Sequence, residues 1–203
     1  MVRLLLIGLL LPTLAWGQAN DDQVGFSSDN PISMGEKPVN YSSYEGNFRI
    51  TFPSGCGKVV TRVPSEDSPD VDGIPAVQVT ITFCDRFGEK GEGCSVTSYF
   101  NVTNDDGRYP GPQQVIDRVL NALKSMGVVI QEQAPLSKEF PDGTVIEGID
   151  ILAAETSGAG QAWLRGLIYE GDIYVLSAWK STGDLWGNPE FITFFNSFQP
   201  GTD

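Results

Sequence analysis

The N-terminal segment limits what this chain can fold into, because it holds the longest apolar run in the sequence. Arg3 supplies a positive charge, Leu4–Leu11 is apolar, and the small residues Ala15, Gly17 and Ala19 lie near the end of the segment. This order is typical of a secretory signal peptide. We therefore expect residues 1–17 to be a signal peptide, with cleavage after Gly17 or after Ala19, and the protein to be exported to the periplasm or the extracellular space.

The same run is shorter than the roughly 20 apolar residues that a membrane-spanning helix needs. We therefore predict no stable membrane insertion once the signal is cleaved. The chain has 13 Lys and Arg against 26 Asp and Glu, which gives a formal charge of −13. An acidic surface repels phosphate backbones, so we predict no nucleic-acid partner.

The chain contains no histidine. Ser-His-Asp and Cys-His catalysis are therefore excluded in their usual form, as are zinc sites that depend on imidazole. The sequence offers no catalytic constellation, and we expect no cofactor. These exclusions favour a binding or accessory protein over an enzyme.

Residues 18–43 are polar and are predicted to form a flexible leader, with a single α+β domain over 44–203. Alternating apolar residues predict strands, and a spacing of three and four predicts helices. The expected strands cover 48–52, 58–63, 77–83, 95–102, 144–153, 161–169 and 173–180, with one more possible at 128–131; the expected helices cover 112–126 and the segment that follows the cap Asn188. The fold class is therefore a mostly antiparallel sheet covered by two helices.

The strand Tyr174–Ala178 and the helix ending Phe194–Phe198 resemble the corresponding parts of the PsbP-like families. These include photosystem extrinsic subunits and small exported bacterial proteins. The resemblance covers about residues 44–200 and implies an α-β-α sandwich that works as an accessory subunit. The chain departs from the lipoprotein relatives, because it has extra cysteines and lacks the cysteine that would carry a lipid.

Cys56, Cys84 and Cys94 are expected at one end of the sheet if the first strands form a meander. In an oxidising compartment one disulfide is expected. We favour Cys84–Cys94, which would join neighbouring strands across their loop, and Cys56–Cys94 is the alternative if the strand order is not sequential. The remaining thiol would be buried or inert.

Three charged residues interrupt the apolar strands. Glu147 and Asp150 are three residues apart on one strand, so their side chains point to opposite faces and cannot form a carboxylate pair. Arg165 on the next strand is a possible partner for either one. A structural ion pair is the favoured interpretation, and an arginine that grips a ligand is the alternative.

Two loops could take part in recognition. Two tryptophans bracket a polar loop before the last helix, and we predict that any recognition surface lies there, formed by Trp179, Lys180, Asp184 and Trp186. An acidic loop offers weak calcium candidates in Glu66, Asp67, Asp70 and Asp72, and residues 104–107 offer a second set. Asp-Gly clusters are also ordinary turn formers. Asn40 and Asn101 begin glycosylation sequons, which matter only in a host that glycosylates secreted proteins.

Together these features predict an exported, soluble, non-enzymatic protein that binds another envelope or secreted component, with a protein as its partner. One alternative is a glycan hydrolase, which needs two carboxyl groups about 5–10 Å apart in a cleft. The other alternative is a calcium-binding module.

Overall fold

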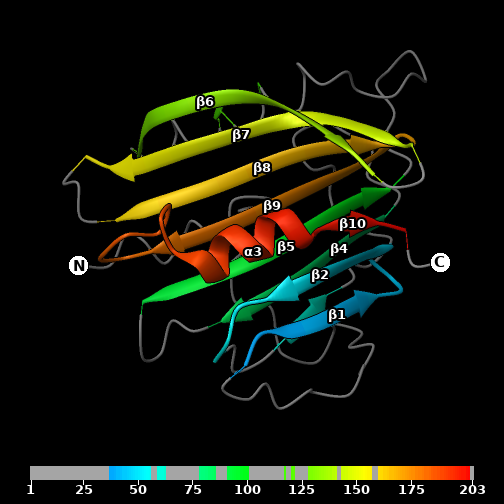
Figure 1. Cartoon of the computed structure of the whole chain (residues 1–203), viewed down its shortest axis with the longest axis horizontal. Coiled ribbons are helices and arrows are strands. Elements are labelled where there is room, and N and C mark those ends of the chain that lie inside the picture. The colour runs from blue at the N-terminus through cyan, green and yellow to red at the C-terminus, as the bar shows by residue number, and fades with distance from the viewer. Residues whose placement is uncertain are drawn as a thin grey trace, which may run out of the picture.

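The computed structural model describes residues 37–55, 59–62, 78–85, 91–100, 117, 120–121, 128–140, 143–156 and 160–201. These residues form two antiparallel sheets and a helix (Figure 1). The larger sheet has seven strands in the order β3-β4-β5-β9-β8-β7-β6. Its strands are β3 (Val59–Arg62), β4 (Gln78–Asp85), β5 (Glu92–Phe100), β6 (Val128–Glu139), β7 (Val145–Glu155), β8 (Gln161–Tyr169) and β9 (Asp172–Lys180).

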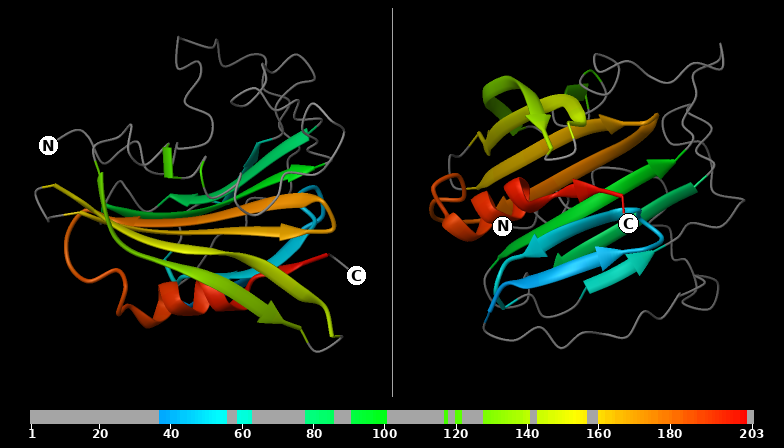
Figure 2. Two further views of the ribbon diagram at one scale, coloured as in Figure 1. Left: turned by 90° about the horizontal axis from the view of Figure 1, so that it is seen from above. Right: turned by 45° about the vertical axis from the view of Figure 1, so that its right-hand side comes forward.

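The smaller sheet has three strands in the order β1-β2-β10, namely β1 (Val39–Ser43), β2 (Phe48–Phe52) and β10 (Gln199–Pro200). It lies with the helix α3 (Pro189–Ser197) on one side of the larger sheet (Figures 1 and 2). The two ends of the described chain meet in this sheet, because Pro200 pairs with Phe48. The small sheet therefore anchors the segment that follows α3.

An aromatic core joins the small sheet, α3 and the large sheet. Phe52 of β2 lies 5.6 Å from Phe194 of α3 between ring centroids, and Phe198 lies 5.2 Å from Tyr174 of β9. Each of these side chains is at most 1% exposed. Burying aromatic rings of this size is the main favourable contribution to such a core.

The sequence at the start of α3 accounts for the position of the helix. The Asn188 side chain accepts a hydrogen bond from the Glu190 amide at 2.9 Å, and Pro189 occupies the first turn. Such a cap satisfies an amide that has no partner within the helix. Phe191, Phe194 and Phe195 form the buried stripe, so the helix predicted after Asn188 is confirmed.

The predicted α-β-α sandwich with two helices is wrong. The structure is mostly antiparallel sheet in two layers, and a second sheet lies beside α3 on the face that we expected a helix alone to cover. Alternation shows that 48–52 is a strand, but it does not show which sheet the strand joins. Of the helix predicted over 112–126, only Asp117, Leu120 and Asn121 are described; these three are helical, and the rest lies outside the described residues.

Two strands depart most from expectation. β1 lies in the segment that was assigned to the leader, so ordered structure begins before the boundary predicted at Tyr44. β6 runs to Glu139, well beyond the predicted end at 131. Exposed and partly buried residues alternate along most of β6, because it is the edge strand of the sheet. Pro135 also interrupts the usual strand pattern. Proline is tolerated there because its missing N–H faces the free edge.

Candidate functional site

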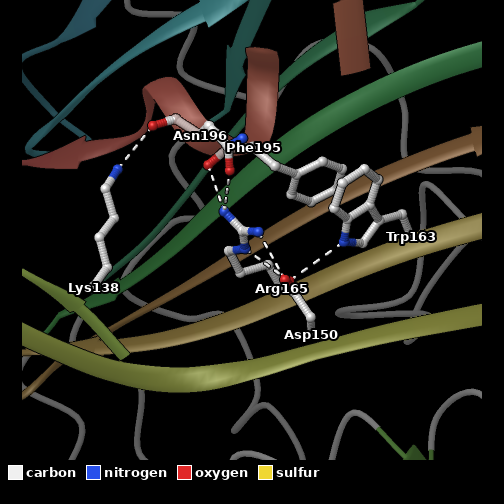
Figure 3. Close-up of polar contacts among 6 residues, drawn as sticks. All are labelled: Lys138, Asp150, Trp163, Arg165, Phe195 and Asn196. Atoms are coloured by element: carbon white, nitrogen blue, oxygen red, sulfur yellow. Dashed lines mark hydrogen bonds and ion pairs between the residues drawn. The ribbon is translucent and has the colours of Figure 1, made fainter. Parts of the chain in front are cut away.

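The clearest polar cluster in the described residues is centred on Arg165 of β8 (Figure 3). Its Nε donates to Oδ1 of Asp150 on β7 at 2.7 Å, and its Nη2 donates to Oδ2 at 2.7 Å. Arg165 is 5% exposed, and the Asp150 side chain is 22% exposed. This two-point contact matches the fork of the guanidinium to the carboxylate, which is the strongest geometry for such a pair.

The strand register explains why these two residues meet. Arg165 and Asp150 are direct partners across β7 and β8. In the same ladder the Glu155 amide donates to the Gly160 carbonyl, so these two residues form a hydrogen-bonded pair. Hydrogen-bonded and non-hydrogen-bonded pairs alternate along an antiparallel ladder, which makes Asp150 and Arg165 a non-hydrogen-bonded pair. Side chains are closest at such pairs.

Arg165 also reaches the C-terminal end of α3. Its Nη1 donates to the Phe195 carbonyl at 2.7 Å and contacts the Asn196 side-chain oxygen at 3.4 Å. The last carbonyls of a helix have no partner within it and carry partial negative charge, so a cation there is favourable. One guanidinium therefore joins β7, β8 and the end of α3.

Aromatic rings enclose this arginine. Trp163 stacks on Phe195 with ring centroids 4.2 Å apart and an angle of 21° between the planes. The Trp163 Nε1 donates to Asp150 Oδ1 at 3.3 Å. The guanidinium carbon of Arg165 lies 5.4 Å from the centre of the Phe195 ring, within the range of a cation–π interaction. The rings limit access of water to the ion pair.

Lys138 of β6 supplies a second cation to the same helix end. Its Nζ donates to the Asn196 carbonyl at 2.8 Å (Figure 3). It also donates to the Phe198 carbonyl at 2.8 Å. Burial lowers the pKa of Lys138, and the positive charge of Arg165 lowers it further. Sequence reasoning missed this residue. The available signal was that α3 has no basic residue in its own last turn, so its carbonyls needed donors from elsewhere.

The cluster answers the question that the sequence left open about Arg165. Its partner is Asp150, whereas Glu147 is exposed and lies opposite Ile168. The Nε and Nη2 groups of Arg165 donate to Asp150, and its Nη1 donates to the end of α3. The structural ion pair is therefore the better interpretation, and a ligand grip by Arg165 would require these contacts to break.

The predicted recognition loop is only partly a surface. Trp179 is 3% exposed, and Trp186 is half-buried with its Nε1 donating to the Ala162 carbonyl at 3.2 Å. Asp184 is exposed and accepts a hydrogen bond from the Gly187 amide, and Lys180 pairs with Glu92 at 3.5 Å. The tryptophans therefore support the loop, and its polar residues are what it presents to solvent.

The structure describes two of the three cysteine positions and none of the calcium candidates. Cys94 is 1% exposed on the α3 face of β5, and it lies opposite Cys84 in the ladder. Cys56, the acidic residues Glu66, Asp67, Asp70 and Asp72, and the segment 104–107 lie outside the described residues. Within the described ranges, no three His, Cys, Asp or Glu side chains gather as a metal site would require. No described helix is both long and apolar enough to cross a membrane.

Comparisons with known proteins identify no family. No family model matches the sequence, and no curated protein matches it. A solved structure of a Pseudomonas aeruginosa protein of unknown function is similar to this chain at a TM-score of 0.31 and 9% identity, over 71% of this chain and 83% of that chain. Similarity at this level carries no argument about function, and the resemblance to the PsbP-like families stays a prediction.

Proposed function

We propose that this protein is an exported, non-enzymatic binding or accessory protein that engages a protein in the cell envelope or outside the cell. The signal-like N-terminus supports export. The observation that carries the binding role is the exposed loop between β9 and α3, which the sheet holds in place. Arg165 is 5% exposed and is bonded to Asp150 and to α3, so the strongest polar cluster stabilises the fold.

Recognition is then a property of the exposed surface. The loop between β9 and α3 is our candidate, because Thr182, Gly183 and Asp184 are exposed there while Leu185 is fully buried. The Leu185 amide donates to the Gln161 side chain at 2.7 Å, which fixes the loop to the sheet. An exposed loop on a rigid support is a common form of protein-recognition site.

Site-specific photo-crosslinking tests this proposal. A photoreactive amino acid is placed at Thr182 in the loop or at Val145, which is exposed at the opposite end of the sheet. Both variants are expressed as the full chain in the native host, and the envelope and secreted fractions are illuminated. We expect one specific protein adduct from the Thr182 variant and none from the Val145 variant.

Two results would overturn the proposal. Equal capture, or no protein capture, by the two variants would remove the loop as a recognition surface. Hydrolysis of a glycan by the purified chain would favour the enzyme alternative instead. The calcium alternative is separated by melting temperature, because a resident ion stabilises the folded state and a chelator would lower the melting temperature.

A further inference from the structure

Cys84 and Cys94 occupy directly opposite positions on neighbouring strands. The antiparallel register of β4 and β5 pairs Gln78 with Phe100 and continues to Cys84 with Cys94. We propose that these two residues form a cross-strand disulfide in the exported protein, and that this bond closes the loop between β4 and β5. The inference rests on the export that we propose above, because such bonds persist in oxidising compartments.

The ladder geometry fixes how far apart the two backbones lie. The Ser181 amide donates to the carbonyl of Gly91, the residue just before β5, at 2.8 Å. Every second residue from there, beginning with Gly93 and Ser95, therefore directs its backbone N–H and C=O groups to β9. Cys94 therefore directs its backbone groups to β4, and it forms a hydrogen-bonded pair with Cys84. Such pairs have Cα atoms about 5.5 Å apart, which is inside the range of about 4.4–6.8 Å found for disulfides.

The Cβ–Cβ distance of a hydrogen-bonded pair is at the long end of the range for opposite residues in a sheet. Forming the disulfide therefore draws the two strands together locally. Gly93 stands next to Cys94, and a glycine gives the backbone freedom to make that adjustment. Cys94 is 1% exposed and belongs to the core beneath α3 and the small sheet. A bond at this position would be shielded from solvent reductants.

Cys56 is the competing partner. It precedes Val59 by three residues, and Val59 pairs with Cys84 on the other side of β4. Cys84 therefore lies between Cys94 and the start of β3. Its direct ladder partner among the cysteines is Cys94, and this register is the reason for choosing the pair Cys84–Cys94.

The chemistry is thiol–disulfide exchange with an oxidising protein disulfide. One cysteine thiolate attacks that disulfide, and a mixed disulfide forms. The second thiolate then attacks the mixed disulfide and releases the oxidant as a dithiol. Two electrons and two protons pass from the two cysteines to the oxidant, and one S–S bond forms in this protein.

Peptide mapping of the full chain recovered from an exporting host tests the pairing. Free thiols are alkylated before proteolysis without reductant, and the matched variants are Cys56→Ser, Cys84→Ser and Cys94→Ser. We expect a peptide linked through Cys84 and Cys94 in the wild type and in Cys56→Ser. The bond closes a ring of about 11 residues, so reduction is expected to raise the unfolding equilibrium constant about a hundredfold.

A second arm separates this inference from the proposal of export. The purified chain is reduced, and it is then reoxidised in a glutathione buffer. A Cys84–Cys94 bond that forms in this buffer but is absent from protein taken from cells would support the pairing and contradict export to an oxidising compartment. Linkage through Cys56, or complete alkylation of both Cys84 and Cys94 after reoxidation, would overturn the pairing itself.

Discussion

Replacing Asp150 with alanine removes the carboxylate that accepts two hydrogen bonds from Arg165. The guanidinium stays in place, because Nη1 is still bonded to the Phe195 carbonyl and the rings of Trp163 and Phe195 enclose it. A cation that is 5% exposed then has no counter-ion. The perturbation therefore measures the cost of an uncompensated charge at the join between the sheet and α3.

Breaking a buried ion pair by removing one partner costs about 3–5 kcal/mol. The Asp150 side chain is 22% exposed, so water can enter where the carboxylate stood and the lower end of that range applies. We expect the free energy of unfolding to fall by about 3 kcal/mol. For a chain of this size the melting temperature should fall by about 6–12 °C.

Urea unfolding of Asp150→Ala measures this cost, and Glu147→Ala is the matched control. Glu147 lies three residues earlier on the same strand, is exposed and points to the opposite face, so its replacement should change stability by less than about 0.5 kcal/mol. The double variant Asp150→Ala with Arg165→Met should lose less than the sum of the two single losses, because both charges are gone. Equal stability of the Asp150 and Glu147 variants would refute the reasoning.

Two further predictions concern the core around α3. Phe195→Ala should lower the free energy of unfolding by about 3–5 kcal/mol, since its buried ring stacks on Trp163. Ile192→Ala, on the exposed side of the same helix, should lower it much less, and urea titrations of the two variants measure the difference. Burial raises the pKa of Tyr174, and Asp172 raises it further, so above about pH 10 the unfolded chain loses this proton before the folded chain does. Stability should therefore fall as the pH rises through 10 and beyond, and Tyr174→Phe should reduce that fall; an unchanged alkaline slope would contradict it.

Much of the local structure could be predicted from the sequence because it depends on near neighbours. The strands β7, β8 and β9 begin and end within two residues of the predicted limits, since their apolar residues and turn glycines are local signals. The cap Asn188 and the aromatic stripe of α3 were equally visible. β6 was underestimated because an edge strand has little apolar alternation.

The tertiary structure decided what depends on distant partners. The sequence by itself determined which residues share a face of a strand, and so excluded a pair between Glu147 and Asp150. Strand register then chose Asp150 for Arg165, and the packing of α3 brought Lys138 and Arg165 to its carbonyl end. Local periodicity carries no information on which sheet a strand joins or which charge faces a helix end. Those choices depend on how segments far apart in the chain pack, as in the placement of β1, β2 and β10 beside α3.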